Sequence, residues 1–474
     1  MQNTDSRRKT WDEIRDVVVI GSGFAGLAAA IEARTAGVSV AILEKMKTPG
    51  GNSVISDGGI AAAGTLMQQK AGIHDSPELM YADMIKAGMG LNHPDLVREL
   101  VEKSNEVFQW SIDCLGVKYL DRVDQFGGHS VPRCYTALNI SGSTIIKQQL
   151  AKVRELGIEL RLQTYFQTFI RNVDGRVSGV LARNCYDRKN AESGNDRCIK
   201  ARKAVILAAG GFGSDVAFRI AQDPRLCEKI DSTNKPSATA EALKEALKIA
   251  AVPVQLSHIQ LGPWASPDEK GFGVGPGFSD YIVFLYGIVV DPNTGKRFVN
   301  ELADRKTLSD AILNIGKPCI GIADAKAVKQ SGWNIDKCLR KGVVKEFYGL
   351  QELASFYGLP YAKLKHSVDQ YNRYVENKVD EEFGKQILSN ALPINCPPYY
   401  GIRLWPKVHH TMGGVQINVR GQVIDLNQQP IQGLYAAGEI AGGIHGACRL
   451  GSCAITDCLV FGRIAGRNAA AEKS

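Results

Sequence analysis

In the first part of the chain, the spacing of apolar residues alternates between that of a strand and that of a helix. Residues 14–20 (IRDVVVI) form a run rich in β-branched side chains that predicts a buried strand, and residues 38–45 (VSVAILEK) form a second one. Between them, residues 21–37 (GSGFAGLAAAIEARTAG) have a helical pattern that ends at Gly37. Strand, helix and strand in this order predict a βαβ unit with a short, glycine-rich first turn.

The rest of the chain continues this mixture of strand and helix patterns. Helical periodicity covers residues 77–87 and 93–112, strand-like runs fill 158–210, and a helical pattern closes the chain. Between about residues 257 and 405 the composition and the order of the predicted elements change. Proline and glycine are frequent at 262–278, and predicted strands then alternate with helices. We therefore predict an α/β fold in which a first domain (residues 14–256 and 406–474) is interrupted by an α+β domain (residues 257–405).

The first turn of the βαβ unit carries the motif Gly21-x-Gly23-x-x-Gly26. The first glycine permits the tight turn, the second lets backbone N–H groups approach a pyrophosphate, and the third lets the helix pack against the strand. The positive helix end stabilises the phosphate charge. Glu44 ends the second strand, where a carboxylate accepts hydrogen bonds from a ribose and repels a 2′-phosphate. The motif therefore predicts a Rossmann-type site for the ADP half of a dinucleotide.

Two further glycine-rich strand ends favour FAD over NAD. AVILAAGG ends at Gly210 and Gly211, and GLYAAGE ends at Gly438 and Glu439. A simple NAD enzyme needs only the first glycine-rich turn, whereas three such ends suit one long cofactor lying across a sheet edge. The candidate cofactor-binding residues are Gly21, Gly23, Phe24, Ala25, Gly26, Glu44, Lys45, Gly50, Gly51, Asn52, Ser53, Gly58, Gly59, Gly210, Gly211, Gly438, Glu439, Ser452, Ala454 and Ile455.

Composition and charge limit the kinds of ligand and the cell compartment that we expect. The net charge is +8, but the basic residues are scattered and not interleaved with aromatic residues, which favours anionic small molecules over nucleic acid. The 11 cysteines form neither a C-x-x-C pair nor a haem motif, so we expect no metal site. We also expect no membrane span and no signal peptide, because long apolar runs are missing and residues 1–13 are polar. These features favour the cytoplasm, or the periplasm if a presequence has been removed.

Several motifs resemble those of a known family. They are EKM-x-x-x-GGNS at residues 44–53, GGHSVPR at 127–133, RFVNELADR at 297–305, HHTMGG at 409–414 and GEIAGGIHGACRLGSCAI at 438–455. In order and spacing they resemble the flavoprotein of soluble fumarate reductases, a family that includes flavocytochrome c and the succinate dehydrogenase flavoprotein subunit. The resemblance extends from about residue 14 to residue 468.

The resemblance implies an FAD-binding domain interrupted by a mobile capping domain, with the active site between them. In this family hydride passes from flavin N5 to one alkene carbon, and an arginine, matched here by Arg305, gives a proton to the other. The substrate carboxylate is held by matches of Arg449 and His409, and His410 is expected beside the flavin, among the substrate-binding residues. No histidine in SVISDGG matches the covalent attachment site of the succinate dehydrogenase subunit, so FAD is expected to be non-covalent.

The cations also suit the chemistry without the family. Adding hydride to an alkene conjugated with a carboxylate builds negative charge on the carboxylate side, and cations that grip the carboxylate stabilise this charge. An arginine can donate a proton to such a carbanion-like centre if another group then returns a proton to it.

Two departures from the family pattern change the expected substrate. Where fumarate reductases carry a histidine for the second carboxylate, this chain has Gly262, followed by Trp264. An ungapped count back from the proton-donor arginine to the family's Thr, Glu and Arg, which hold substrate and relay protons, reaches Asp280, Tyr281 and Phe284. A roomier, more aromatic far end with one carboxylate clamp favours an α,β-unsaturated monocarboxylate, such as acrylate, a cinnamate or urocanate. Asp280 could bond a polar tail of the substrate or take over the relay.

Other functions stay open. One is fumarate reductase proper, and one of another class is a non-catalytic FAD-binding partner subunit, which the retention of Arg305, His409 and Arg449 disfavours. A dehydrogenase acting beside a steroid ketone is also disfavoured, because that chemistry uses a tyrosine pair and no carboxylate clamp. Since neither a haem motif, an FMN attachment domain nor an NADH domain is present, we expect a separate electron donor, such as a cytochrome, reduced flavin or an FMN-bearing partner.

Overall fold

The computed structural model describes residues 10–473, so most of the polar start considered above for a signal peptide lies outside the described residues. Within this range the largest sheet has eight strands. Its order is β17 (Gln422–Ile424), β18 (Pro430–Ala436), β8 (Asn195–Leu207), β1 (Glu13–Ile20), β2 (Val40–Leu43) and β5 (Glu159–Arg161), and β6 (Thr164–Arg171) pairs with β7 (Val177–Asn184), which pairs with β8. From β18 to β5 the strands are parallel. Because such strands are covered on both faces, they read as continuous apolar runs rather than alternating ones.

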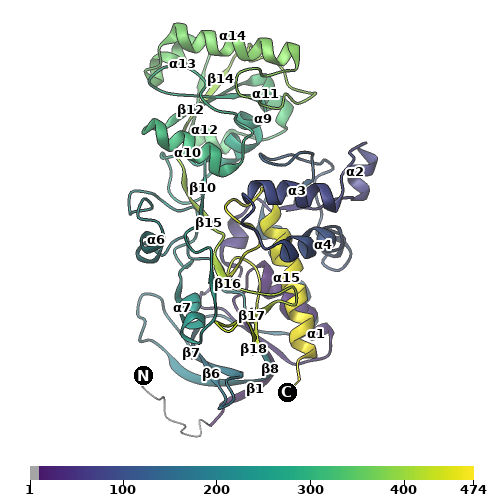
Figure 1. The fold of residues 1–474 in the computed structure, drawn as a ribbon. Coiled ribbons are helices and arrows are strands. Elements are labelled where there is room, and N and C mark those ends of the chain that lie inside the picture. The colour runs from purple at the N-terminus through teal and green to yellow at the C-terminus, as the bar shows by residue number, and fades with distance from the viewer. Residues whose placement is uncertain (1–9, 474) are drawn as a thin grey trace.

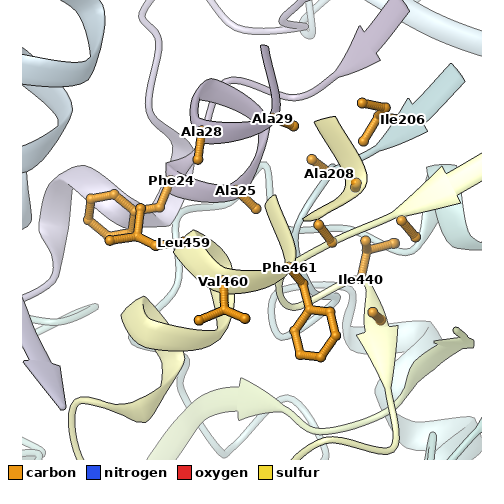
Figure 2. Packing of buried hydrophobic residues seen from close by; sticks show 14 of the residues in the cluster. Phe24, Ala25, Ala28, Ala29, Ile206, Ala208, Ile440, Leu459, Val460 and Phe461 are labelled. Atoms are coloured by element: carbon orange, nitrogen blue, oxygen red, sulfur yellow. The ribbon is translucent and has the colours of Figure 1, made fainter. Parts of the chain in front are cut away.

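Helix α1 (Phe24–Thr35) follows β1 through the glycine turn and packs along the last helix, α15 (Cys453–Ala471). Figure 2 shows the alanines of α1 beside the apolar side chains of α15. The close approach requires glycine on α15: a Cβ on Gly462 would lie 2.6 Å from the carbonyl oxygen of Ala25, and one on Gly466 would lie 2.3 Å from that of Ala29. The last helix is thereby held against the helix that follows the glycine turn.

Shorter elements complete this lobe. They are η1 (Gly51–Ile55), β3 (Gly59–Ala61), α2 (Leu66–Lys70), α3 (Pro77–Ala87), α4 (Pro94–Asp113), β4 (Cys134–Thr136), α5 (Gly142–Glu155), α6 (Val216–Gln222), α7 (Glu241–Lys248), β9 (Pro253–Val254), β16 (Gly414–Gln416) and β19 (Ala441–Gly442). None of the helices in residues 10–473 is long and apolar enough to span a membrane.

A second lobe is built on an antiparallel sheet of β11 (Ile288–Val290), β12 (Cys319–Asp324), β14 (Tyr399–Leu404) and β13 (Val344–Phe347). Its helical segments are α8 (Gly275–Phe278), η2 (Ser279–Val283), α9 (Phe284–Tyr286), α10 (Arg305–Ile315), α11 (Ala325–Ser331), α12 (Asp336–Arg340), α13 (Leu350–Tyr357) and α14 (Tyr361–Asn377). Figure 1 shows this lobe in green at the top, joined to the rest by the antiparallel pair β10 (Ile259–Gly262) and β15 (Lys407–Thr411). It has an apolar core of its own around Phe278, Ile282 and Leu404. We propose that residues 257–405 are the capping domain.

The predicted α/β class is confirmed, and most predicted elements form where the pattern places them. The strand predicted at 14–20 is β1, and the helices predicted at 77–87 and 93–112 are α3 and α4. The run at 158–170 divides into β5 and β6, with Gln163 between them at φ +50°. A left-handed residue of this kind breaks a strand, and periodicity alone does not reveal it.

Candidate active site

A first cavity lies at the carboxyl ends of β1, β2, β8 and β18. It brings together the three glycine-rich strand ends, as expected where parallel strands finish at one edge of a sheet. The candidate cofactor-binding residues that line it are Gly21, Gly23, Phe24, Ala25, Glu44, Lys45, Gly51, Asn52, Ser53, Gly210, Gly211, Gly438 and Glu439.

The glycines of the first turn have distinct packing reasons. Gly21 has φ +103°, and a Cβ there would lie 2.3 Å from the carbonyl oxygen of Ala208. A Cβ on Gly26 would lie 2.0 Å from the carbonyl oxygen of Gly21, so Gly26 serves the packing of α1 rather than lining the cavity. Gly50 and Gly58 are also outside its lining and have φ of +100° and +77°, which only glycine adopts readily.

Two charged features of this cavity suit an ADP group. The N-cap of helix α1 is Gly23, which has no side chain to cap the first turn; the Phe24 N–H donates to the Ser53 hydroxyl at 3.1 Å, and the N–H groups that follow it can face an anion. Glu44 is buried, and its carboxylate accepts hydrogen bonds from the Ser22 hydroxyl at 2.6 Å and from the Met46 N–H at 2.9 Å. The carboxylate is therefore held in place at the end of β2, where a ribose would lie.

A second, larger cavity of about 520 Å³ lies between the two lobes. Helix α15 begins at its wall, and the Oγ of its N-cap residue Ser452 is buried without a partner among residues 10–473. The candidate residues that line this cavity are Gly59, Trp264, Asp280, Tyr281, Arg305, His409, Arg449, Ser452, Ala454 and Ile455. The structure thus brings the predicted proton donor, both members of the predicted carboxylate clamp and the start of α15 to one space.

Two guanidinium groups dominate the electrostatics of this cavity. Arg449 is buried; its Nη1 donates to the Leu450 carbonyl at 3.1 Å, while its Nε has no partner within the described residues. Burial, assisted by the positive charge of Arg305, lowers the pKa of Arg449 to about 10, so the group is still charged at neutral pH. The Nη1 of Arg305 is likewise buried without a partner in the described part of the chain. Buried guanidinium N–H groups without partners are costly, and an anion bound in this cavity would satisfy them.

Asp280 is the carboxylate that faces the predicted proton donor. Its Oδ2 lies 3.8 Å from Nη2 of Arg305, which is an ion-pair distance but too long for a hydrogen bond. Burial raises the pKa of Asp280 to about 6; Arg305 and Arg449 oppose the rise and Asp57 adds to it. Asp280 therefore exchanges its proton close to neutral pH, unlike an ordinary surface aspartate.

His409 lies beside the two arginines, and contacts with a hydroxyl group and an indole ring fix its orientation. Its Nδ1 is 2.8 Å from the Thr233 hydroxyl, and its ring meets the Trp264 ring edge-on at 4.8 Å. Burial, then Arg449 and Arg305, keep the pKa of His409 well below the usual value, so the imidazole is neutral. His410 points elsewhere: it is buried outside the lining of this cavity, with Nδ1 3.5 Å from a carboxylate oxygen of Glu439.

Gly262 and Trp264 form a matched pair. Gly262 does not line the cavity, and a Cβ on it would lie 2.8 Å from Cζ2 of Trp264. Trp264 is only 2% exposed and packs against Phe272 as well as His409. The indole therefore takes space that a side chain at position 262 would need.

Two other predicted substrate-binding residues differ in position. Tyr281 lines the cavity, but its ring is stacked on Trp333 at 4.5 Å and its hydroxyl is 3.5 Å from both Thr136 and Asp57. Phe284 does not line this cavity; it faces a separate small cavity behind Arg305. The wall of the 520 Å³ cavity is thus aromatic, and its rings pack in pairs, Tyr281 on Trp333 and Trp264 against Phe272.

Arg305 is positioned by the segment that precedes it. It is the first residue of α10, and the N-cap residue Asp304 accepts hydrogen bonds from the N–H groups of Lys306 and Thr307 at 3.0 and 3.1 Å. Upstream, Arg297 is fully buried and pairs with Glu301 and Asp380 at 2.7 and 2.8 Å. The motif RFVNELADR therefore combines a buried ion cluster with a helix cap, and both fix the start of α10.

Sequence reasoning missed several residues of these sites. Those that line the larger cavity include Asp57, Asn139, Ser141, Phe272, Trp333 and Lys337. They come from segments far apart in the chain and carry no motif, so no local signal marks them. Ser22, within the glycine motif, is an exception, because a serine beside a buried carboxylate is a natural hydrogen-bond donor. No group of three or more His, Cys, Asp or Glu side chains that could hold a metal ion occurs in residues 10–473.

A cavity at the carboxyl ends of a parallel sheet and a second cavity between the two lobes, lined by two arginines, fit a flavoprotein oxidoreductase of the fumarate reductase type. The chain belongs to the FAD binding domain family, which it matches over residues 16–455.

Named relatives narrow the comparison. The chain is 44% identical to the "Acrylate reductase flavoprotein subunit" of Shewanella woodyi over 96% of this chain and 91% of that protein. It is 36% identical to the "Urocanate reductase" of Eggerthella lenta over 96% of this chain and 74% of that protein. Among solved structures, the open conformation of a flavocytochrome c3 fumarate reductase matches with a TM-score of 0.75 at 33% identity, over 97% of this chain and 79% of that one.

Proposed function

We propose that this protein reduces the carbon–carbon double bond of a small α,β-unsaturated monocarboxylate of the acrylate type. The observation that carries the proposal is the pair of buried guanidinium groups, Arg305 and Arg449, with unpartnered N–H groups in one cavity. Support also comes from the relatives, whose names specify reduction of acrylate, urocanate and fumarate.

Arg449 and His409 bind the substrate carboxylate. Arg449 supplies positive charge and an unpaired Nε–H. We assign the Thr233 hydroxyl proton to Nδ1 of His409 at 2.8 Å rather than to the Val408 carbonyl at 3.3 Å, which leaves the imidazole proton on Nε2 to donate to the other carboxylate oxygen. Both groups draw electron density toward the carboxylate, and this polarises the conjugated double bond and stabilises the charge that develops on it.

Arg305 is the proton donor. Its Nη1–H is free of partners in the described structure, and its position at the start of α10 is fixed by the Asp304 cap. FAD, when bound and reduced, supplies the hydride. The residues present fit this cofactor: the uncapped start of α1 and Glu44 suit its ADP half, and the uncapped start of α15 suits an electron-rich ring that gains negative charge on reduction.

The far side of the cavity disfavours a second carboxylate. Trp264 takes the space beside Gly262, and Asp280 adds a carboxylate of its own. Desolvating an unpaired carboxylate costs several kcal/mol, and the one other cation among the residues that line this cavity, Lys337, has an exposed side chain. Fumarate is therefore a poor fit, and among monocarboxylates the 44% identity to the acrylate reductase flavoprotein subunit favours acrylate over cinnamate or urocanate.

The test is a comparison of kcat/KM for acrylate, fumarate, cinnamate and urocanate with one artificial electron donor. We expect acrylate to exceed fumarate by about 30-fold or more, because several kcal/mol of uncompensated desolvation correspond to at least that factor. Fumarate as the best substrate would overturn the proposed substrate class. Failure of every acid to reoxidise the reduced flavin would instead support a non-catalytic FAD-binding subunit.

We further propose that FAD is bound non-covalently. The residues around the cavities include no histidine in the segment 54–59. Acid precipitation is expected to leave a colourless protein pellet and stoichiometric FAD in the supernatant, measured by absorbance and chromatography. Flavin retained by the precipitated chain would contradict this.

We propose a separate protein or small carrier as the electron donor, either a cytochrome, reduced flavin or an FMN-bearing partner. The support is the printed name of the relative from Shewanella woodyi, which describes a flavoprotein subunit.

A further inference from the structure

We propose that Asp280 returns a proton to Arg305 after each turnover, and that the proton reaches Asp280 from a small cavity on the side of Arg305 away from the substrate. This inference rests on the proposed function, because it concerns how the proton donor is recharged. The family's relay residues are replaced here by Tyr281 and Phe284, and neither side chain can return a proton to arginine at neutral pH, since burial keeps the pKa of Tyr281 well above its usual value.

Asp280 and Arg305 are the residues shared by two cavities. Both line the large cavity in which the carboxylate clamp lies, and both line a small cavity of about 20 Å³ whose other walls include Gln125, Phe284 and Glu301. A volume of this size holds one water molecule, and a water there has the polar partners it needs in Asp280, Arg305 and Gln125.

The small cavity is adjacent to a more open groove. The groove has a volume of about 210 Å³ and is lined by Lys86, Asn300 and Gln386 among others. Five residues contribute to the walls of both spaces: Gln125, Phe126, Gly127, Leu285 and Leu302. Gln125 is the polar side chain among these five, so the proton route that we propose from the groove to Asp280 passes beside its amide.

The helical segment explains why Asp280 replaces the residue that an ungapped count selects. Residues Ser279–Val283 form a π-helix, η2, inserted between α8 and α9. A π-turn has one residue more than an α-turn, so it shifts which side chains face a given direction, and such turns often occur at functional sites. Here the carboxylate of Asp280 faces Arg305, while the Tyr281 ring turns to Trp333.

Other acidic groups near Arg305 are engaged elsewhere. Glu301 lines the small cavity, but both of its oxygens accept hydrogen bonds from Arg297, at 2.9 and 2.7 Å, and one also accepts the Val289 N–H at 3.0 Å. Its pKa is lowered by Lys385 and Arg297 despite burial, so it stays ionised. Asp57 lines only the large cavity, where an oxygen accepts from the N–H of Gly59 at 3.1 Å.

The proton balance is complete without another reactant. An N–H bond of Arg305 breaks as the new C–H bond of the product forms, which leaves a neutral guanidine. The protonated carboxyl of Asp280 then gives its proton to the guanidine, and a proton from the solvent, passed on by the water in the small cavity, reprotonates the carboxylate. Once Arg305 is neutral, its charge no longer opposes protonation of Asp280, so the carboxylate takes up a proton more readily.

Besides burial, the charged groups that set the pKa of Asp280 are Arg305, Arg449 and Asp57. Above pH 6 the protonated fraction of Asp280 falls about tenfold per pH unit, so proton return slows as pH rises. The first turnover is not affected in the same way, because Arg305 begins it already charged.

Asp280→Asn tests the proposal in two measurements on the FAD-loaded enzyme. Anaerobic stopped-flow mixing of pre-reduced enzyme with acrylate measures the first turnover, and reduced methyl viologen measures steady-state turnover. We expect the first-turnover rate to stay within about threefold of wild type, and steady-state turnover to fall at least tenfold and lose its decline above pH 6. Asp280→Glu should restore part of the steady-state rate.

Asp124→Asn is the matched control, because Asp124 is also a buried carboxylate with a raised pKa and an arginine partner, but lies outside both cavities. It should leave both rates within about threefold. A second readout needs no turnover: difference infrared spectroscopy of the oxidised protein should show a carboxyl band that titrates near pH 6 and is lost in Asp280→Asn.

Unchanged steady-state turnover in Asp280→Asn, or equal loss of both rates, would overturn the relay. Absence of flavin reoxidation in the wild-type protein with every unsaturated acid would overturn the proposed function and the relay together, so the two failures are distinct.

Discussion

Replacing Arg305 by lysine is expected to lower kcat by about 100- to 10,000-fold, the usual range for loss of a positioned general acid, while FAD content and KM change little. Lysine keeps the positive charge but is shorter and places one compact ammonium group instead of a planar fork. It therefore preserves attraction for the substrate carboxylate and loses the N–H that reaches the alkene carbon. The measurement is steady-state kinetics with acrylate and a reduced viologen, with FAD quantified spectroscopically.

The neighbouring Lys306 offers a matched control for this change. Its ammonium group is half-exposed and pairs with Asp310 on the surface of α10. Lys306→Gln should leave kcat within about threefold of wild type, because exposed ion pairs contribute little. Comparable activity of Arg305→Lys and wild type would show that a different group protonates the substrate.

Arg449→Met should lower kcat/KM for acrylate by about 30- to 5,000-fold. Removing one partner of a buried charged pair costs about 2–5 kcal/mol, and each factor of ten in rate corresponds to about 1.4 kcal/mol. Without Arg449, Arg305 would be the one arginine left in the lining of this cavity, and a carboxylate bound beside neutral His409 would also face the carboxylate of Asp280. The effect should appear in KM as well as kcat, unlike that of Arg305→Lys.

Methionine has nearly the length of the arginine stem, so the fold should tolerate the change, and a thermal melt checks this. Arg225→Met is the control, since the Arg225 side chain is 81% exposed and remote from both cavities. A KM for acrylate that is the same in Arg449→Met and wild type would mean that another residue binds the carboxylate.

Local pattern predicted the frame of the fold because its elements depend on short-range chemistry. The β-branched run before Gly21 and the alanine-rich stretch after it specify β1 and α1 through periodicity and propensity alone. The placement of the second lobe over the sheet was accessible only through family resemblance. Its contacts join residues far apart in the chain, and no local preference encodes them.

The candidate site also has parts that local sequence predicts and parts that it does not. Asp304 and Thr307 form a cap that is readable from sequence, so the start of α10 at Arg305 follows from local rules. The π-turn at 279–283 has no such signature, so local pattern does not show that Asp280 faces Arg305 while Phe284 lies outside the larger cavity. The support of His409 by Thr233 is likewise invisible, because 176 residues separate them.

The fit between Gly262 and Trp264 limits how this protein can acquire a new substrate by successive single mutations. A side chain added at 262 collides with the indole, whose nearest ring atom would be 2.8 Å from the new Cβ. Truncating the tryptophan first leaves a void, and loss of a buried aromatic side chain costs about 3–5 kcal/mol, a large part of the stability of a typical domain. Either order of mutation thus passes through a damaged intermediate. Positions 262 and 264 must therefore be replaced together before the protein can accept a dicarboxylate.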